Sequence, residues 1–394
     1  MEIIVQKYGG TSVNDPQCRM KIAENAKSVI NEGFHPVIVV SAMGRYPGAY
    51  ATDTLLSLVG SDYRDKRSKD LLMSCGEIIS TVVVSDCLVR NGINAVPVTG
   101  GQAGIRTDDN YSDAEILSID PMPLMDRISR GEIPVVAGFQ GMSAEGEVTT
   151  LGRGGSDTTA TAIAAALHAS SVEIYTDVDG IMNADPNVVE SAEIFDTISY
   201  SDIYLMASSG AKVIHPRAVR YAQMANIDVS ILNISKPRGS KHTVITGSNS
   251  AVNPLFSAVT SISHKTQISV ECSDTAQQND MFDAIARKGI NIDMINISNR
   301  SCQYITDDVN VDDVVSVLEG LKIPYELRRG VADVTAIGDR VHSTPGVMAK
   351  IINALYSEKI DVFQTSDSGR TISVLVRDTD AKEAVIALYR IMYS

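Results

Sequence analysis

The chain has 394 residues, 44% of them hydrophobic, and a formal net charge of −14. This length predicts two or three compact units rather than one. The acidic balance argues against non-specific binding to nucleic acid, which requires a cationic surface. No apolar run reaches membrane-spanning length and no signal-peptide pattern opens the chain, so we expect a cytoplasmic protein that contacts neither nucleic acid nor membrane.

Five cysteines and six histidines are scattered along the chain. The cysteines are Cys18, Cys75, Cys87, Cys272 and Cys302. Because they form no Cys-x-x-Cys pair, we interpret them as reduced, mostly buried thiols. The histidines lack the spacing of metal ligands, so no protein-held metal site is predicted.

Strand-like and helix-like patterns alternate through residues 1–245. The strand-like runs are residues 2–6, 36–41, 95–98, 133–137, 172–176 and 228–232. The helical patterns lie near residues 16–32, 68–91, 156–169 and 215–226. This alternation predicts an α/β fold with a largely parallel sheet covered by helices on both faces. Ligands of such sheets bind at the carboxyl ends of the strands.

Two glycine clusters carry the strongest chemical signal. Lys7-Tyr8-Gly9-Gly10-Thr11-Ser12 follows the first strand, and Gly152-Arg153-Gly154-Gly155-Ser156-Asp157 opens the helix at 156–169. We expect both clusters at strand carboxyl ends of one sheet. Bare amide groups, a helix N-terminus and a nearby lysine together form a phosphate cradle. The clusters lack the spacing of a Walker A loop, a protein kinase or a dinucleotide fingerprint.

Within these clusters, Lys7 can place a point charge against a transferring phosphoryl group. Arg153, exposed between glycines, can form a bidentate pair with a carboxylate or phosphate. Ser156 or Asp157 is expected to cap the following helix. A solvated lysine beside a tight turn would explain Lys7 equally well if it stood alone.

Further polar residues fall near the same predicted edge. Asp177-Val178-Asp179-Gly180 follows the strand at 172–176, although acidic turns with glycine are common. Glu77, in Ser74-Cys75-Gly76-Glu77, is either a surface carboxylate or a partner for a substrate ammonium group. Ser41 and Thr52 could supply hydroxyl contacts.

The composition changes after the last of these strands. Residues 233–254 are rich in Ser, Asn, Gly and Pro and predict a closing hairpin and a linker. Beyond them a strand-helix-strand-strand-helix order occurs twice. The predicted elements are strands at 266–271, 290–297 and 301–306 with helices at 275–288 and 310–320, then strands at 331–337, 360–365 and 371–376 with helices at 346–358 and 380–392. Such units resemble ferredoxin-like βαββαβ motifs, and pairing would cover their sheet edges.

Taken together, the motifs resemble the signatures of the aspartate kinases. The motifs that carry this resemblance are Lys7 to Ser12, Val40-Ser41-Ala42-Met43-Gly44, Ser74 to Glu77, Gly152 to Asp157, Asp177-Val178-Asp179-Gly180-Ile181 and Gly210-Ala211-Lys212-Val213-Ile214-His215-Pro216-Arg217-Ala218. They occur in the family's order. The resemblance implies an amino-acid kinase fold at 1–247, a linker at 248–262 that could add a strand to a regulatory unit, and ACT units at 263–330 and 331–394.

The resemblance also implies roles for individual residues. Catalytic roles fall on Lys7, Asp157 and Lys212, with Asp157 pairing with the lysines. ATP contacts fall on Lys7, Gly9, Gly10, Thr176, Asp177, Asp179, Asp185 and Lys212. Aspartate contacts fall on Ser41, Thr52, Glu77, Arg153, Gly154, Gly155 and Ser156. In the ACT units, the candidate effector contacts are residues at matching places in the two repeats: Asn291, Asp293, Met294, Gln364 and Thr365. Ordinary strand and loop residues would explain these positions equally well.

The implied reaction is transfer of the ATP γ-phosphoryl group to the β-carboxylate of L-aspartate, the first step toward lysine and diaminopimelate, threonine and methionine. A carboxylate is ionised at pH 7, so no general base is needed. Mg²⁺ would travel on the nucleotide phosphates. The ACT units imply feedback by an amino acid and a homodimer or higher homo-oligomer.

Two departures from the family pattern bear on specificity. Thr54 stands where the family more often has an acid, and the first ACT unit has Ser273-Asp274-Thr275-Ala276 in place of Pro-Gly. The tail is most similar to the diaminopimelate-responsive class of Gram-positive bacteria. The alternatives are a kinase of the same fold for glutamate, carbamate or a nucleotide, and an inactive amino-acid sensor. The sensor is disfavoured because Lys7, Asp157 and Lys212 are all present.

Overall fold

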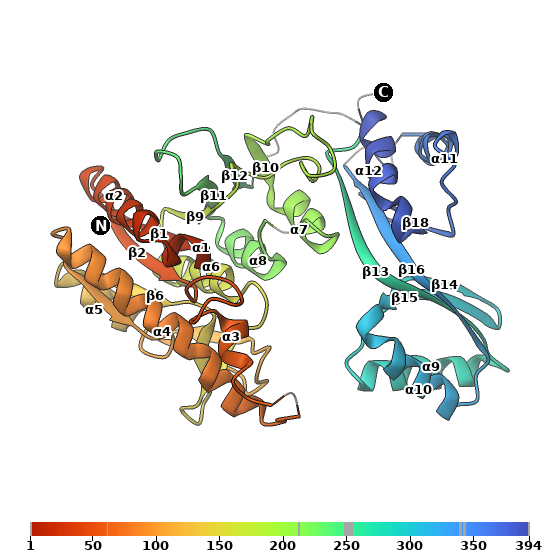
Figure 1. Cartoon of the computed structure of the whole chain (residues 1–394), viewed down its shortest axis with the longest axis horizontal. Helices are drawn as coiled ribbons and strands as arrows, with labels where there is room; N and C mark the ends of the chain where they lie inside the picture. Colours follow the sequence, from red (N-terminus) through yellow and green to blue (C-terminus); the bar gives the residue numbers. More distant parts are fainter. Residues whose placement is uncertain are drawn as a thin grey trace. The chain divides into compact units, whose positions relative to one another are not determined.

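The computed structural model describes residues 2–60, 62–211, 213–247, 255–338, 341 and 344–392. The chain forms two compact units (Figure 1). The first comprises Met1–Ile181, Ile194–Ser208 and Lys212–Ser250, and the second comprises Met182–Glu193, Ser209–Ala211 and Ala251–Ser394. The chain therefore passes between the two units several times.

The first unit is built on a sheet with the strand order β10-β12-β11-β9-β1-β2-β6-β3. Its strands are β1 (Ile3–Tyr8), β2 (His35–Val40), β3 (Ala95–Val98), β6 (Ile133–Ala137), β9 (Ser171–Thr176), β10 (Thr197–Ser199), β11 (Asp228–Asn233) and β12 (Thr243–Thr246). Neighbouring strands run parallel, apart from the antiparallel pair β11 and β12. The largely parallel sheet and the closing hairpin are thus confirmed.

Helices cover both faces of this sheet. The helices of this unit are α1 (Gly10–Asn14), α2 (Pro16–Asn31), α3 (Thr52–Leu56), α4 (Lys66–Arg90), α5 (Met122–Ser129), α6 (Gly155–Leu167), α7 (Tyr200–Ser208) and α8 (Pro216–Ala225). Residues of α2 and α4 share a core with Tyr8, Ile38 and Tyr175. α6 packs against β1, β2 and β9. Consecutive residues of the central strands are buried, as expected of a sheet covered on both sides.

Helix α4 is long and apolar enough to cross a membrane by length and composition. That finding differs from the expectation that no segment reaches this threshold. In the fold, α4 packs against β2, β3 and β6, and its buried positions include Met73, Glu77 and Leu88. Asp65 is the N-cap of α4, and its carboxylate accepts a hydrogen bond from the Ser68 amide. α4 is therefore a core helix of the first unit.

A smaller sheet, in the order β5-β4-β7-β8, accompanies the main one. Its strands are β4 (Ile105–Thr107), β5 (Ile116–Ile119), β7 (Gln140–Met142) and β8 (Val148–Thr150). The second glycine cluster follows β8. The expectation that both clusters end strands of one sheet is therefore wrong: the first follows β1 of the main sheet and the second follows the small sheet.

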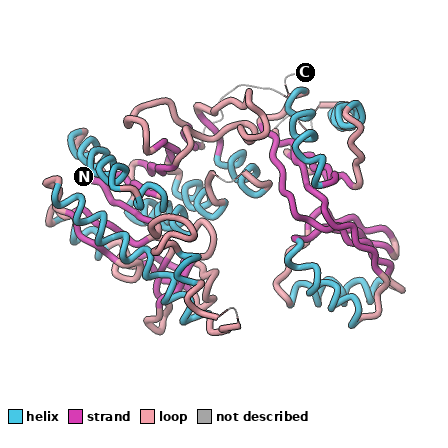
Figure 2. Tube along the Cα trace, in the orientation of Figure 1, coloured by secondary structure: helices cyan, strands magenta, loops and turns pink. Residues whose placement is uncertain are grey.

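The second unit is built on a sheet with the order β14-β15-β13-β16-β18-β17, drawn in magenta in Figure 2. Its elements are β13 (Ala258–Glu271), α9 (Thr275–Arg287), β14 (Asp293–Ser298), β15 (Ser301–Asp307), α10 (Val311–Gly320), β16 (Tyr325–Ile337), α11 (Val347–Ser357), β17 (Gln364–Asp367), β18 (Thr371–Arg377) and α12 (Ala381–Arg390). The repeated element order is confirmed. The predicted strand at 360–365 is misplaced, because pairing with β18 begins at Gln364.

Two long strands join the two repeats. Residues 258–262 of β13 pair with 333–337 of β16, and residues 267–270 pair with 325–328. The register shifts between these stretches, at Lys265. One half of β13 thus pairs with each repeat, and residues 258–262 lie beside the second.

The two larger hydrophobic cores among the described residues of the second unit lie one under each repeat, and a smaller cluster contains Ile305, Val331 and Leu375. One of the larger cores gathers Ile268, Met281 and Leu318, and the other gathers Val334, Ile351 and Leu388. The segment 182–193 joins the latter core through Ala184 and Val189.

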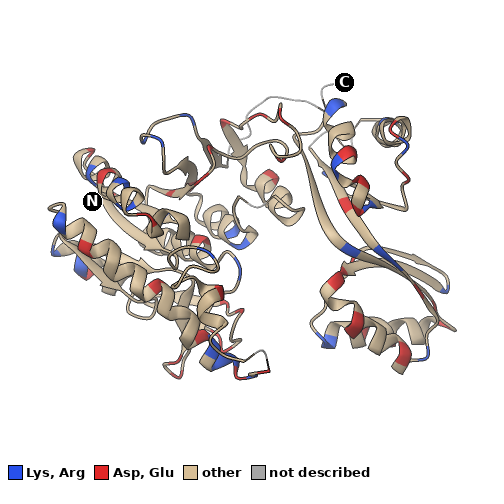
Figure 3. Ribbon diagram, viewed as in Figure 1, with Lys and Arg blue, Asp and Glu red and all other residues tan. Residues whose placement is uncertain are grey.

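Charged residues of both signs are interspersed over both units (Figure 3). The five cysteines are free thiols. Cys272 and Cys302 are buried and Cys75 is exposed, so the expectation of mostly buried thiols holds only in part.

Candidate active site

A cleft of about 840 Å³ in the first unit collects most of the predicted site residues. This volume is in the range of small-molecule sites. Its lining includes Lys7, Gly9, Gly10, Ser41, Thr52, Glu77, Arg153, Gly154, Gly155, Ser156, Asp157, Thr176 and Asp177. Segments that are far apart in the sequence therefore meet around one cavity.

Lys7 enters the cleft near the end of β1, between β2 and β9. Its ammonium group lies 2.7 Å from Asp157 Oδ1, and the two side chains are 12% and 13% exposed. The next residue, Tyr8, stacks on Tyr175 with ring centroids 4.7 Å apart. Gly10 must be glycine, because a Cβ there would lie 2.5 Å from the Ala42 carbonyl oxygen. The strand end is thus held rigidly where Lys7 meets the cavity.

The second glycine cluster forms the start of α6. The helix begins at Gly155, and its N-cap is Gly154, with φ of 67°. Ser156 and Asp157 therefore lie inside the first turn, and the expectation that one of them caps the helix is wrong. Asp157 is instead free to pair with Lys7. Arg153 is exposed in the cleft, and no described residue forms an ion pair or hydrogen bond with its guanidinium group.

Glu77 is a buried carboxyl group at the cleft wall. Its residue is 2% exposed, and Oε1 accepts a hydrogen bond of 3.1 Å from the Ala42 amide. Oε2 is buried without a hydrogen-bond partner in the described structure. Burial raises the pKa of Glu77 to about 8. Such a group is suited to a cationic ligand that enters the cleft.

Strand β9 ends at Thr176, and the acidic residues Asp177 and Asp179 follow it. Thr176 and Asp177 line the cleft, and Asp177 lies 3.5 Å from Arg45. Asp179 is not among the described lining residues. It pairs with Lys236 at 2.8 Å and accepts from Asn233 at 2.8 Å, and the Lys236 hydrogen bond lowers its pKa.

Two further predicted nucleotide contacts are not part of the described cleft. Asp185 belongs to segment 182–193, which packs with the second unit. Its carboxylate accepts from the Asn187 amide at 2.9 Å. Lys212 lies outside the described residues, whereas its neighbour Val213 lines the cleft.

The cleft also contains cations that sequence reasoning missed. Lys66 and Lys69, from the first turn of α4, line it, and no described side chain pairs with either. Lys69, Met73 and Glu77 are spaced four residues apart on one helix face. This spacing, continued backward from Glu77, could have identified Lys69.

Asp70, fully buried on α4, ties the helix to two neighbouring segments. Its carboxylate accepts from the amide and hydroxyl of Thr150 at 2.7 and 2.9 Å, and from those of Ser112 at 2.9 and 3.1 Å. Four hydrogen bonds satisfy this buried charge. Asp70 thus fixes the start of the second glycine cluster relative to α4.

Three of the predicted effector residues meet in the second unit. Gln364 donates to the Met294 carbonyl and accepts from Gln267 at 2.8 Å. Asp293 lies 3.6 Å from the buried Lys265 ammonium, which also pairs with Asp307 at 2.7 Å. Asn291 contributes its carbonyl to Thr306 at 3.2 Å, and Thr365 is exposed on β17.

Comparison with known proteins gives the family. The chain matches the amino acid kinase family over residues 2–233 and the ACT domain over residues 326–390. It is 39% identical over 401 residues to aspartokinase 1 of Bacillus subtilis (strain 168), with 99% of both chains covered. It is 36% identical to an aspartokinase of Geobacillus stearothermophilus, with 99% and 97% covered. The chain belongs to the aspartokinases.

Solved aspartokinase structures have the same fold. Aspartokinase III of E. coli in complex with aspartate and ADP (R-state) superposes with a TM-score of 0.86, at 27% identity and full coverage of both chains. The same enzyme with lysine and aspartate (T-state) gives 0.75. The predicted amino-acid kinase fold followed by ACT units is therefore confirmed.

As an aspartokinase, this chain is an ATP-dependent kinase that phosphorylates the β-carboxylate of L-aspartate and yields 4-phospho-L-aspartate and ADP. Its small-molecule ligands thus include a nucleotide and an amino acid. The ACT domain is consistent with allosteric feedback regulation.

Proposed function

We propose that the cleft binds ATP against Lys7, Gly9 and Gly10 and binds aspartate against the Arg153 loop and Glu77. The observation that carries this assignment is the Lys7–Asp157 ion pair, which joins the two glycine clusters in one cavity. A nucleotide phosphate and an anionic acceptor can meet there because cations and exposed amides converge from both clusters.

The acceptor site would bind the α-carboxylate and the α-ammonium group of aspartate through separate residues. Arg153, with no described partner of its own, would hold the α-carboxylate in a bidentate pair. Glu77 Oε2 would accept from the α-ammonium group. Because the pKa of Glu77 is about 8, the free carboxyl is mostly protonated at pH 7, and binding of the ammonium group would release that proton. Ser41, Thr52, Gly154, Gly155 and Ser156 would complete this site.

Phosphoryl transfer would require no general base, because the β-carboxylate is already ionised. Lys7 would neutralise charge on the transferring group, and Asp157 would hold the Lys7 ammonium in place. The N-terminus of α6 would add its unpaired amides on the acceptor side. Catalysis would then consist of positioning and charge stabilisation.

The remaining nucleotide contacts are assigned to Thr176, Asp177, Asp179, Asp185 and Lys212. Among the described residues, no group of three or more His, Cys, Asp or Glu side chains gathers as ligands of a metal ion. Mg²⁺ would then be held chiefly by nucleotide phosphates and water. When bound, the ion would neutralise phosphate charge.

We also propose the limits of the domains: a catalytic domain at 1–247, a linker at 248–262, and ACT units at 263–330 and 331–394. In the ACT units, Asn291, Asp293, Met294, Gln364 and Thr365 would contact an amino-acid effector, for which diaminopimelate is our first candidate. Feedback of that kind suits the first step of lysine, threonine and methionine synthesis. Pairing of ACT units would make a cytoplasmic homodimer or higher oligomer.

The residue assignments are tested by trapping the acyl phosphate with hydroxylamine while ADP release is followed. L-aspartate should give hydroxamate and L-glutamate should not. Arg153→Ala should raise KM for aspartate with little change in KM for ATP. An equal loss for both substrates would contradict the role of Arg153. A thermal-shift series with diaminopimelate, lysine, threonine and methionine tests the effector.

A further inference from the structure

The loop that carries Arg153 is closed by a hydrogen bond of 3.1 Å from the Gly155 amide to the Gly152 carbonyl, but its glycines provide no side-chain anchor. Gly152 and Gly154 flank Arg153, with φ of 70° and 67°, and Gly155 follows. Glycine has the widest backbone freedom and provides no side chain to anchor a loop. Contacts from other segments therefore contribute to the position of this loop and to the direction of the Arg153 side chain.

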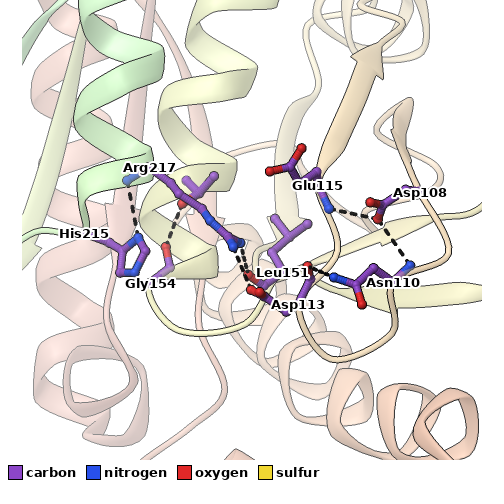
Figure 4. A network of polar contacts seen from close by, with 9 residues as sticks. Asp108, Asn110, Asp113, Glu115, Leu151, Gly154, His215 and Arg217 are labelled. Atoms are coloured by element: carbon purple, nitrogen blue, oxygen red, sulfur yellow. Dashed lines mark hydrogen bonds and ion pairs between the residues drawn. The ribbon is translucent and has the colours of Figure 1, made fainter. Parts of the chain in front are cut away.

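Arg217, in the first turn of α8, supplies one such contact (Figure 4). Its Nη1 donates a hydrogen bond of 2.9 Å to the carbonyl of Leu151, the residue directly before Gly152. Its Nη2 lies 2.7 Å from Asp113 Oδ1. One planar guanidinium group thus bridges the glycine loop and the turn at 108–115.

His215, the N-cap of α8, supplies the second contact. Its Nδ1 accepts from the Arg217 amide at 3.3 Å. A Cβ on Gly154 would lie 2.1 Å from the His215 Cβ, so the two residues are in close contact. The start of α8 therefore holds the loop on both sides of Arg153, at Leu151 and at Gly154.

The Asp113 end of the bridge is itself fixed. Asn110 donates to the Asp113 carbonyl at 3.0 Å, and Asp108 accepts from the amides of Asn110 and Glu115 at 3.3 and 2.9 Å. Ser112, next to Asp113, is bound to the buried Asp70. The turn therefore offers Arg217 a rigid anchor.

We propose that Arg217 is a positioning residue for aspartate, which acts by fixing the Leu151 carbonyl and with it the direction of the Arg153 side chain. Arg217 is not among the described residues that line the cleft, so it acts through the loop. The inference rests on the proposed role of Arg153. An ordinary exposed ion pair would instead contribute little to stability and nothing to substrate affinity.

The test compares Arg217→Ala and Arg217→Lys with Arg220→Ala, an exposed arginine on the same helix. Arg217→Ala should raise KM for aspartate about tenfold to a hundredfold, since small misplacements of binding groups have effects of this size. KM for ATP and the melting temperature should match those of Arg220→Ala. Arg217→Lys should be intermediate, because one ammonium group cannot reproduce the planar bridge.

The mechanism is tested in an Arg153→Ala background. If Arg217 acts through Arg153, adding Arg217→Ala should leave the aspartate KM of Arg153→Ala unchanged. An equal increase in both backgrounds would overturn the proposal. If Arg153→Ala alone leaves KM unchanged, the proposed role of Arg153 fails first, whereas an effect of Arg153→Ala without one of Arg217→Ala refutes only the present inference.

Asp113→Asn is the second variant, in case Arg217→Ala folds poorly. It removes the ion pair and leaves the Arg217–Leu151 hydrogen bond. A smaller rise in aspartate KM that disappears in the Arg153→Ala background supports the proposal. An unchanged KM in a folded Asp113→Asn enzyme contradicts the anchoring role of the bridge.

Discussion

The Lys7 ammonium group lies 2.7 Å from the Asp157 carboxylate, with both side chains largely shielded from water. This contact joins the central strand β1 to the first turn of α6. Because Asp157 is not used as a helix cap, its charge is available to Lys7. The pair therefore sets the relative position of the two glycine clusters.

Replacing Lys7 tests this arrangement. Lys7→Ala should lower kcat by about two to three orders of magnitude, since charge-stabilising groups of this kind contribute on that scale. The Kd for ATP should change little, because the backbone amides at Gly9 and Gly10 remain. Lys27→Ala, an exposed lysine on α2, is the matched control. Turnover of Lys7→Ala close to that of the control would remove Lys7 from the catalytic group.

Glu77 predicts a pH dependence of stability. Its pKa is raised from 4.5 to about 8 by burial, so the folded state binds this proton more tightly than the unfolded chain. The stabilising contribution is complete below pH 4.5 and is lost as the pH rises through 8. Glu77→Gln should therefore gain stability over the native chain from pH 5 to pH 9, by on the order of a few kcal/mol.

Denaturant unfolding at pH 5 and pH 9 measures this difference, with the exposed Glu24→Gln as control. A Glu77→Gln advantage that does not grow with pH would show that burial does not hold the carboxyl protonated. The same variant should bind aspartate more weakly and lose the proton release on binding, which calorimetry in buffers of different ionisation enthalpy detects.

Gly154 and Gly146 form a matched pair for the α8 contact. Both have positive φ, 67° and 85°, but a Cβ would meet His215 only at Gly154, whereas nothing lies within 4 Å at Gly146. Gly146→Ala should cost about 1–2 kcal/mol of backbone strain and leave kinetics unchanged. Gly154→Ala should in addition raise KM for aspartate. An equal KM for aspartate in the two variants would mean that aspartate binding does not depend on the close contact between Gly154 and His215.

Asp333 offers a stability test in the second unit. Burial raises its pKa from 3.8 to about 6, although Thr335 and Ser373 hydrogen bonds oppose the shift. Its contribution to stability is thus largest below pH 4 and is lost as the pH rises through 6. Asp333→Asn should be stabilised relative to the native chain at pH 7 but not at pH 4. Chemical denaturation against the exposed Asp283→Asn checks this, and a difference independent of pH would contradict it.

The sequence predicted the helices and strands well wherever the hydrophobic periodicity extended over many residues. The central strands and the helices α2, α4, α6 and α8 lie within a few residues of their predicted ranges, because each buries a face over several turns or pleats. The small sheet was missed because β4, β7 and β8 have three residues each. Alternation over three residues cannot be distinguished from a loop.

The cleft was predictable as a set of motifs, but its contacts were not. The pairing of Lys7 with Asp157 followed from the resemblance. Ser156 does not cap α6 because Gly154, with its positive φ, takes the N-cap position. Lys69 lines the cleft because of the way α4 packs. Both features are set by tertiary packing, which cannot be deduced from the residue type at one position.

The segment 182–193 leaves the first unit between β9 and β10 and packs in the second. Val259 donates to the Asn183 carbonyl at 2.9 Å, and Tyr389 donates to the Ser191 carbonyl at 2.8 Å. An expressed fragment that stops at residue 247 would carry Ala184 and Val189 without the side chains that bury them. Such a fragment should expose apolar side chains and self-associate. Deleting the segment 182–193, rather than changing the residue at which the fragment ends, should restore its solubility.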